Sequence, residues 1–296
     1  MVYGAIDLGG TNIRVALLDS SYKILDSIHE PSVHGTKEDL GKQIVRMFRE
    51  LLSRHTGLSI RYVGISAAGF FENGAIKLSI NLNNIRDFDI VAILTKAFPN
   101  MLFRAANDAN CSALIEALEG AGKNYDSALF MTISTGIGVG LVVGKKLVDL
   151  PFETGHMQVN YHDHYYDFES ICSGNGIVNL CRLNSIDVAS AKDFFALVSA
   201  KDKKIMPVYD DWLHLLGSVL ANLQLNFNTE IDILSGGVMK SLDVFEKDLL
   251  KVTNDFLKPY PCRKVAFKEG LFKQDTGIYG GLAEAISLEN DDKKRF

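Results

Sequence analysis

The sequence predicts an α/β protein of two domains. Glycine is concentrated at three places, each directly after a short apolar run that is typical of a strand: Gly9–Gly10, Gly136–Gly140 and Gly236–Gly237. Between them, stretches with apolar residues at the helical period alternate with short β-branched runs. This alternation favours an α/β fold, and 296 residues suffice for one large domain or two ordinary ones.

The first two glycine groups belong to units of the same kind. Residues 3–18 are expected to form a strand, a glycine turn and a second strand, and residues 128–143 repeat this order. Two unrelated hairpins are the plainer alternative, because glycine turns between strands are common. The repeat instead favours a duplicated unit, with a cleft between two domains where ligands usually bind. We expect the first domain to span 1–118 and the second 119–276, with a helix at 277–290 that can pack back on the first.

The remaining elements follow from periodicity and from capping residues. Apolar residues at helical spacing predict a helix around Leu40–Leu52, which Thr36 can cap at its start and Gly57 can close at its end. Residues 151–170 are expected to be an irregular polar stretch, and 291–295 a solvated tail. The other expected elements are strands at 62–66, 101–105, 231–234 and 263–268 and helices at 89–98, 109–118, 174–183, 191–199, 209–226, 243–257 and 277–288.

Composition excludes several classes of protein. Charged residues make up 23% and apolar residues 47%, the balance of a globular rather than a disordered chain. No apolar run approaches the ~20 residues of a membrane helix and residues 1–10 show no basic signal segment, so we expect a cytoplasmic protein without a membrane partner. A net charge of −5 without a basic stripe argues against nucleic acid as a partner. Four scattered cysteines predict no disulfide framework.

The turn between the first two expected strands has the composition of a phosphate site. Its two glycines free backbone N–H groups to point at phosphate oxygens, and a threonine and an asparagine add side-chain donors. A carboxylate so close to a phosphate would repel it unless Mg²⁺ lay between them, which suggests a metal–nucleotide complex. The residues concerned are Asp7, Gly9, Gly10, Thr11 and Asn12.

A second glycine turn, in the repeated unit, can hold the same phosphates from the other side. It contains Ser134, Thr135, Gly136 and Gly138. There is no Walker A lysine pattern and no G-x-G-x-x-G sequence that opens a helix, so neither the P-loop nor the dinucleotide-binding fold fits.

Asn107 and Asp108 lie between an expected strand and an expected helix. Asparagine or aspartate at this place is the ordinary N-cap of a helix, so a purely structural role is one interpretation. The functional interpretation makes Asp108 a general base that takes a proton from an attacking hydroxyl, with Asn107 beside it as a donor to the substrate. The sequence alone leaves both open.

The polar stretch at 151–170 carries Glu153, His156 and Glu169. A solvated surface loop is one interpretation of this composition. Paired acceptors also suit a polyhydroxylated ligand, since each of its hydroxyls needs a partner when it is buried. The stretch is therefore also a candidate ligand site.

Taken together, these segments resemble the ROK family of sugar kinases, repressors and related proteins. The motifs stand in the family's order over nearly the whole chain. The resemblance implies the duplicated architecture of actin, hexokinase and the Hsp70 ATPase, which consists of two RNase H-like domains. The matching segments are Asp7–Arg14 (first phosphate motif), Asn107–Asn110 (catalytic aspartate), Ser134–Gly140 (second phosphate motif), Glu153–Met157 (sugar-binding Glu-x-Gly-His) and Ser235–Met239 (adenosine turn, with Gly236 and Gly237).

The resemblance also implies an activity, that of an ATP-dependent, hexokinase-type sugar kinase that uses Mg²⁺. Asp108 would accept the proton of a hexose 6-hydroxyl as it attacks the γ-phosphoryl group. The sugar-holding residues would be Asn107, Glu153, His156 and Glu169. A homodimer is implied as well. The alternative is a sugar-binding sensor or regulator without catalysis.

The identity of the sugar is less sharply indicated. The segment 236–283 and the sequence Cys172-Ser173-Gly174 resemble the allose-kinase branch, so the expected sugar is D-allose. Glucose, N-acetylmannosamine and β-glucosides stay open as alternatives, because epimers are distinguished by a few hydrogen bonds whose geometry a motif does not show.

The chain departs from the family at the zinc motif. Most members follow the Gly-His segment with a cysteine-rich stretch that, with the histidine, holds a structural zinc. Residues 157–171 contain no cysteine, and zinc needs about four ligands, so we expect the zinc site to be lost. An improvised site is an open alternative, and the sequence does not indicate what else would order this loop. The side chains available for such a site are His156, His162, His164 and Cys172.

Overall fold

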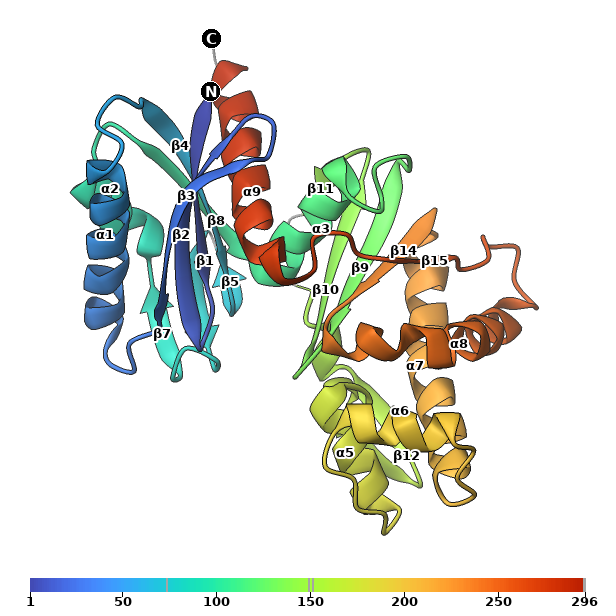
Figure 1. Cartoon of the computed structure of the whole chain (residues 1–296). Coiled ribbons are helices and arrows are strands. Elements are labelled where there is room, and N and C mark those ends of the chain that lie inside the picture. Colours follow the sequence, from blue (N-terminus) through green and yellow to red (C-terminus); the bar gives the residue numbers. More distant parts are fainter. Residues whose placement is uncertain (73, 149, 151, 295–296) are drawn as a thin grey trace. The chain divides into compact units, whose positions relative to one another are not determined.

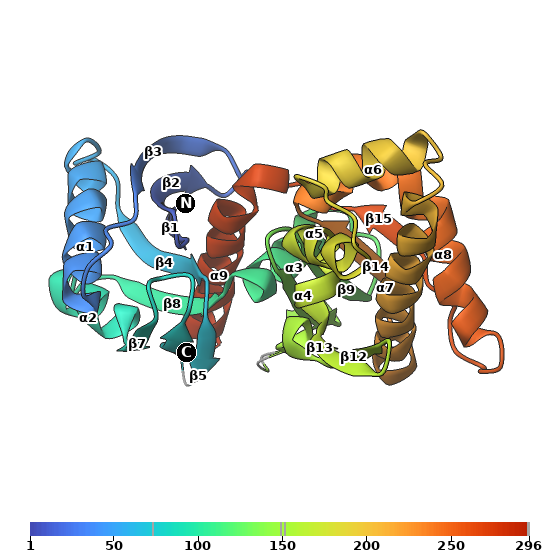
Figure 2. The same ribbon diagram turned by 90° about the horizontal axis from the view of Figure 1, so that it is seen from below.

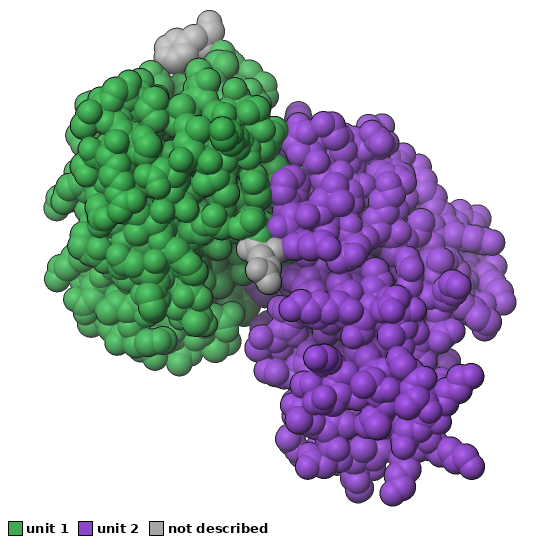
Figure 3. All heavy atoms as spheres, in the orientation of Figure 1, with its two compact units in different colours: residues 1–115, 149–151, 274–296 green, residues 116–148, 152–273 purple. Residues whose placement is uncertain are grey.

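The computed structural model describes residues 1–72, 74–148, 150 and 152–294. The chain forms two compact units, coloured separately in Figure 3. Unit 1 comprises residues 1–115, 149–151 and 274–296, and unit 2 comprises residues 116–148 and 152–273.

Unit 1 is an α/β unit (Figure 1). Its elements are β1 (Val2–Leu8), β2 (Asn12–Asp19), β3 (Ile24–Pro31), α1 (Lys37–Ser53), β4 (Ile60–Ala67), β5 (Phe70–Glu72), β6 (Ala75–Ser79), β7 (Ile85–Phe88), α2 (Ile90–Ala97), β8 (Leu102–Asn107), the start of α3 (Asp108–Glu119) and α9 (Thr276–Lys293).

Unit 2 is also an α/β unit, and α3 ends in it. Its further elements are β9 (Ser127–Ile133), β10 (Ile137–Val143), β11 (Lys146–Leu147), a 3₁₀ helix (Thr154–His156), β12 (Gln158–Tyr161), β13 (His164–Asp167), α4 (Phe168–Cys172), α5 (Gly174–Leu183), α6 (Ala191–Ser199), α7 (Ile205–Phe227), β14 (Ile231–Ser235), a 3₁₀ helix (Gly237–Ser241), α8 (Leu242–Leu257), β15 (Phe267–Glu269) and a 3₁₀ helix (Lys273–Asp275) that ends in unit 1.

The central sheets of the two units have the same pairing order. The strands lie in the order β3-β2-β1-β4-β8 in unit 1 and β11-β10-β9-β14-β15 in unit 2. In each sheet the first strand pairs antiparallel with the second, across the glycine turn, and parallel with a strand from later in the chain. The repeated topology confirms the predicted fold class of two RNase H-like domains.

The sheet of unit 1 is buried on both faces. Successive side chains of a strand point to opposite faces, so β1 serves two cores. Ile6 and Leu8 belong to the apolar cluster that contains residues of α1, whereas Tyr3 and Ala5 belong to the cluster that contains residues of α9. Figure 2 shows α1 and α9 on opposite sides of this sheet.

Helix α1 has the predicted N-cap but not the predicted closing residue at its end. Thr36 accepts a hydrogen bond from the Asp39 N–H, and the Asp39 carboxylate accepts one from the Thr36 N–H, which is a capping box. The helix is capped at its C-terminus by Arg54, so Gly57, the residue expected to close it, lies beyond the cap.

Helix α9 packs directly on the backbone of β4. A Cβ atom placed on Gly64 would lie 1.9 Å from the carbonyl oxygen of Gly281, so only glycine permits this approach. The expectation of a solvated tail at 291–295 is wrong for its described part, because the helix continues to Lys293. Asp291 forms an ion pair with Arg104 at 2.8 Å and Asp292 one with Arg61 at 3.0 Å; residue 295 lies outside the described residues.

The described part of the stretch 151–170, residues 152–170, is not irregular, contrary to the prediction; residue 151 lies outside the described residues. Strands β12 and β13 pair in an antiparallel hairpin, and the positive φ angles of His162 (47°) and Asp163 (61°) are those of a type I′ turn. The hairpin is fastened at its closed end, where the Tyr161 hydroxyl donates to Asp211 at 2.8 Å and accepts from Asn184 at 2.8 Å. Backbone pairing and this anchor order the segment that lacks the cysteines.

Two further elements differ from the prediction for identifiable reasons. Helix α7 begins at Ile205, four residues early, because Pro207 in its first turn needs no intrahelical donor. The expected strand at 263–268 is reduced to β15. The backbone of Val265 pairs with the Asn254 side chain, in both directions, instead of with a neighbouring strand.

The core of unit 2 contains the only tryptophan of the chain, Trp212 on α7. Its indole N–H donates to the carbonyl of Cys172, the last residue of α4, at 3.1 Å. The indole ring packs edge-on against Phe195 and Phe245. Its fluorescence therefore reports on the end of α4.

Among the described residues, no helix is both long enough and apolar enough to cross a membrane.

Asp232 on β14 is a buried acid, only 2% exposed. The Thr229 hydroxyl donates to its Oδ1 atom at 3.0 Å, whereas its Oδ2 atom has no hydrogen-bond partner. Burial raises the pKa of Asp232 to about 7, against the lowering effect of Thr229. Because the pKa in the unfolded chain is about 3.9, the unfolded state loses this proton first, and the stability of the fold falls as pH rises from about 4 to about 7.

Asp232→Asn should remove this loss of stability at higher pH, because the amide keeps an acceptor for Thr229 and never ionises. We expect the variant to be more stable than the wild type at pH 8, by about 1–3 kcal/mol, and nearly equal to it at pH 4.5. Urea unfolding at both pH values measures the difference, with the exposed Asp187→Asn as the matched control. An equal effect at the two pH values would contradict the assignment.

Candidate active site

The first phosphate turn and Asn107-Asp108 lie at the same edge of the sheet of unit 1. Strands β1, β4 and β8 are parallel, and their last residues are paired in register, Leu8 with Ala67 and Ala67 with Asn107. The turn after β1 and the helix start after β8 therefore emerge from one edge, where polar side chains of an α/β sheet usually meet a ligand.

The turn itself is closed by a backbone hydrogen bond and by a close backbone contact that requires glycine at Gly10. The Gly9 N–H donates to the carbonyl of Asn12 at 3.0 Å, and a Cβ atom on Gly10 would lie 2.2 Å from the carbonyl oxygen of Asn81. Ser32, which sequence reasoning missed, holds the turn from the side through its hydroxyl, which donates to Gly9 at 2.7 Å. The side chains of Thr11 and Asn12 are exposed and can reach a ligand.

Asp7 is partly buried and lies near other charged side chains. Burial, first, and the nearby carboxylate of Asp108 raise the pKa of Asp7 to about 7, while Arg14 acts in the opposite direction. Arg14 is paired with Asp7 across β1 and β2 and forms an ion pair with Asp275. A Cβ atom on Gly277 would lie 2.3 Å from the Asp7 carboxyl carbon, so the start of α9 presses on this carboxylate.

Sequence reasoning did not select Arg14, Asp275 or Gly277 as site residues. The antiparallel register of a strand–turn–strand unit could have placed Arg14 opposite Asp7. No sequence signal links Asp275 and Gly277 to the first strand, because the contact depends on the packing of α9.

Asn107 takes the capping role that the sequence left open. Its side-chain oxygen accepts the N–H of Ala109 at 2.9 Å and of Asn110 at 3.3 Å, and its amide donates to the carbonyl of Gly69 at 3.0 Å. Asp108 is the first residue of α3 and is open to solvent. Dense protein surroundings nevertheless raise the pKa of its carboxyl, and the N–H of Ala109, which its Oδ1 accepts at 2.9 Å, lowers it in part.

In unit 2 the second glycine turn, Ser134–Gly138, contacts the Glu-x-Gly-His segment. The Ser134 N–H donates to the carbonyl of Gly136 at 2.9 Å, which closes the turn. The Ile137 N–H donates to the Oε2 atom of Glu169 at 3.1 Å, and a Cβ atom on Gly155 would lie 2.5 Å from the Ile137 carbonyl oxygen. The structure thus brings Glu169, the turn and the Glu-x-Gly-His segment together, which residue spacing could not show.

The other expected residues of unit 2 flank this arrangement. Gly236 has a φ of 98°, and a Cβ atom there would lie 2.4 Å from the carbonyl oxygen of Ile133, so the third glycine turn touches the strand that leads into the second. Gly237 begins the 3₁₀ helix that follows. Glu153 is half-buried and precedes the first 3₁₀ helix of unit 2, and His156, at its end, is exposed with its Nδ1 atom 3.3 Å from Asp167.

A structural zinc site finds no donor set in the described part of the chain. No three side chains of histidine, cysteine, aspartate or glutamate lie together there in a way that could hold a metal ion. Cys172 is buried, and its carbonyl rather than its thiol faces Trp212.

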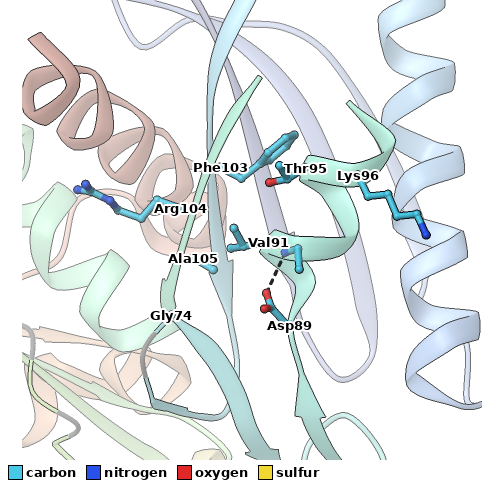
Figure 4. A pocket seen from close by; sticks show the side chains of 9 residues that line it. Gly74, Asp89, Val91, Thr95, Lys96, Phe103, Arg104 and Ala105 are labelled. Atoms are coloured by element: carbon cyan, nitrogen blue, oxygen red, sulfur yellow. Dashed lines mark hydrogen bonds between the residues drawn. The ribbon is translucent and has the colours of Figure 1, made fainter. Parts of the chain in front are cut away.

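A pocket on unit 1 lies apart from these residues (Figure 4). It is bordered by α2, β8 and Gly74, and none of the expected site residues lines it. Two of its charged groups are already engaged, since Asp89 accepts the N–H of Ala92 at 2.8 Å and Arg104 is paired with Asp291. The pocket therefore gives no support to a function.

Known proteins resemble this chain in sequence and in fold over almost its whole length. The chain is 27% identical over 325 residues to a glucokinase from Halalkalibacterium halodurans, covering 99% of this chain and 97% of the relative. Its fold matches that of a ROK hexokinase from Thermus thermophilus with a TM-score of 0.84 and 24% identity, covering 98% of this chain and 100% of the other.

A second solved structure, a ROK family glucokinase from Streptomyces griseus in complex with glucose and AMPPNP, matches with a TM-score of 0.74 and 20% identity over 97% of this chain and 100% of the other. The model of the ROK family matches residues 3–287. The chain therefore belongs to the ROK family.

Proposed function

We propose that this chain is an ATP-dependent sugar kinase that transfers the γ-phosphoryl group of ATP to the 6-hydroxyl of a hexose. One observation carries the proposal: Asp108, at the start of α3, lies at the sheet edge that also carries the first glycine turn. A general base and a phosphate cradle at one edge suit attack by a hydroxyl on a phosphoryl group. The names of the relatives, glucokinase and hexokinase, agree with this class of enzyme.

Asp108 is the proposed general base. A carboxylate with a raised pKa is a stronger base than an ordinary one, so it accepts the hydroxyl proton more readily as the oxygen attacks in line. Because Asn107 caps α3, the cap does not depend on Asp108, although the Oδ1 atom of Asp108 shares the Ala109 N–H with Asn107. The amide of Asn107 adds a donor to the sugar in this proposal.

The glycine turns are proposed to stabilise the charge that develops during transfer. Backbone N–H groups at Gly9, Gly10 and the turn Ser134–Gly138 supply fixed dipoles, which need no reorganisation when the phosphoryl group moves. Thr11 and Asn12 add side-chain donors. Gly236 and Gly237 are proposed to accept the adenosine.

Mg²⁺ fits the carboxylate that unit 1 presents. Asp7 offers oxygen donors, and its charge is disfavoured by burial and by Asp108, so a divalent cation would relieve both effects. One carboxylate is enough, since Mg²⁺ commonly keeps waters and phosphate oxygens as its other ligands. When bound with ATP, the ion would neutralise charge on the phosphate oxygens.

Glu153, His156 and Glu169 are proposed to hold the sugar hydroxyls. D-Allose is proposed because residues 236–283 resemble the allose-kinase branch, whereas the relative from Streptomyces griseus binds glucose. A coupled assay of ADP release with D-allose, D-glucose, N-acetylmannosamine and a β-glucoside tests the proposal. Release that depends on no sugar would overturn the kinase and leave the sugar-binding sensor.

Asp108→Asn should abolish the base while it keeps the shape of the side chain. We expect kcat to fall by a factor of about 10²–10⁴ with little change in sugar affinity. The ADP-release assay gives kcat, and Trp212 fluorescence or calorimetry gives the affinity. Asp187→Asn, at an exposed loop position, is the control that should keep wild-type turnover. Substantial turnover of the Asp108 variant would sink the base assignment.

Gly277→Ala should displace Asp7, because the added methyl group would lie 2.3 Å from its carboxyl carbon. A shift of about 1 Å in a positioning group can cost about 100-fold in rate, so kcat should fall by at least 10-fold. Gly57→Ala is the matched control, since a Cβ atom there meets nothing within 4 Å. Steady-state kinetics with a thermal melt of each variant separates catalysis from folding. Unchanged kcat in a folded Gly277 variant would show that Asp7 needs no such placement.

A further inference from the structure

Glu169 makes a contact that holding a sugar does not require. Its Oε2 atom accepts the N–H of Ile137, which lies inside the second phosphate turn, at 3.1 Å. A carboxylate that accepts a backbone N–H forms a charge-assisted hydrogen bond, one of the stronger kinds in a protein. The side chain proposed to hold a sugar hydroxyl therefore also holds the turn proposed to hold phosphate.

Two glycines leave the space that this carboxylate occupies. A Cβ atom on Gly136 would lie 2.6 Å from Oε2 of Glu169, and one on Gly155 would lie 3.0 Å from the same atom. Gly136 belongs to the phosphate turn, and Gly155 belongs to the Glu-x-Gly-His segment. The Glu169 carboxylate thus lies packed between both segments.

The backbone of α4 supports the same junction. The Ser173 N–H donates to the carbonyl of Glu169 at 3.1 Å, and the Gly174 N–H, one residue further, donates to the carbonyl of Ser134 at 2.7 Å. The short helix that carries Glu169 is therefore fastened to the phosphate turn at a second point. The side chain itself is only half-buried, which leaves part of it open to a ligand.

We propose that Glu169 couples sugar binding to nucleotide binding within unit 2. A sugar hydroxyl that donates to Oε1 would fix the carboxylate in the position in which Oε2 holds the Ile137 N–H. The turn is then ordered before the phosphates bind, so the chain loses less conformational entropy when the nucleotide binds. This inference rests on the proposed function and adds a specific link between its two substrates.

Coupling of this kind is reciprocal and can be measured from either ligand. If the sugar tightens nucleotide binding by some factor, the nucleotide must tighten sugar binding by the same factor. We expect a factor of about 10 for the wild type, within the usual range for coupled sites. Calorimetry gives the Kd of the sugar that supports the fastest ADP release, with and without saturating Mg²⁺–AMPPNP. Trp212, bonded to the end of α4, provides a second signal.

Two variants, one in the turn and one at Glu169 itself, should disrupt the hydrogen bond between Glu169 and the Ile137 N–H. Gly136→Ala places a methyl group against Oε2 and displaces the carboxylate from the turn, whereas Glu169→Ala removes the carboxylate. In each, the coupling factor should fall to about 2 or less, whatever happens to the single affinities. Where a variant binds the sugar weakly, the nucleotide Kd is measured with and without the sugar at a concentration well above the sugar Kd of that variant. A thermal melt and far-UV circular dichroism confirm that each variant is folded.

Asn107→Ser is the matched control for weakened sugar binding. Serine keeps the capping oxygen of α3 but shortens the proposed donor to the sugar, so the sugar Kd should rise while the coupling factor stays near that of the wild type. A factor near 1 in the wild type, or an undiminished factor in the folded Gly136 and Glu169 variants, would overturn the inference alone. Absence of any sugar-dependent ADP release from the wild type would instead overturn the proposed function, and the inference with it.

Discussion

The C-terminal helix can lie on the sheet of unit 1 only because Gly64 has no side chain. At this point the α9 backbone replaces the Cβ atom that any other residue would place there. The helix then covers one of the two faces of the sheet. Its N-cap, Asp275, contacts Arg14, and Gly277 in its first turn lies against Asp7. The geometry around the first phosphate turn therefore depends on a contact between residues more than two hundred positions apart in the sequence.

The duplicated fold could be predicted because it depends on local patterns. Each half begins with a strand, a glycine turn and a second strand, and the alternation of helices and strands follows, so the family and fold class are confirmed. The hairpin of β12 and β13 could not be predicted in this way. Its strands are short and mostly exposed or half-buried, and its turn uses His162 and Asp163 instead of glycine or asparagine. Neither apolar alternation nor turn composition therefore marks it. Asp291 and Asp292 were mistaken for a tail because their partners Arg104 and Arg61 lie far away in the sequence.

In the candidate site, too, short local motifs could be predicted from the sequence, whereas contacts between distant residues could not. The glycine turns and Asn107-Asp108 could be selected from the sequence because each is a short motif, and the role of Asn107 as a cap follows from its place before a helix. The bond between Glu169 and Ile137 could not, since it joins residues 32 positions apart through the packing of three segments. The roles of the individual site residues and the homodimer stay predictions, because motifs and folds do not by themselves fix function.

The place of α9 in the fold also bears on how the protein is made. A ribosome completes all of residues 116–273 before it produces the helix that covers β1 and β4. During that interval unit 2 can fold as a continuous stretch of nascent chain, whereas the apolar face of Tyr3, Ala5 and Tyr62 waits uncovered. Until residues 276–293 have been translated, this face of the unit 1 sheet lacks its covering helix.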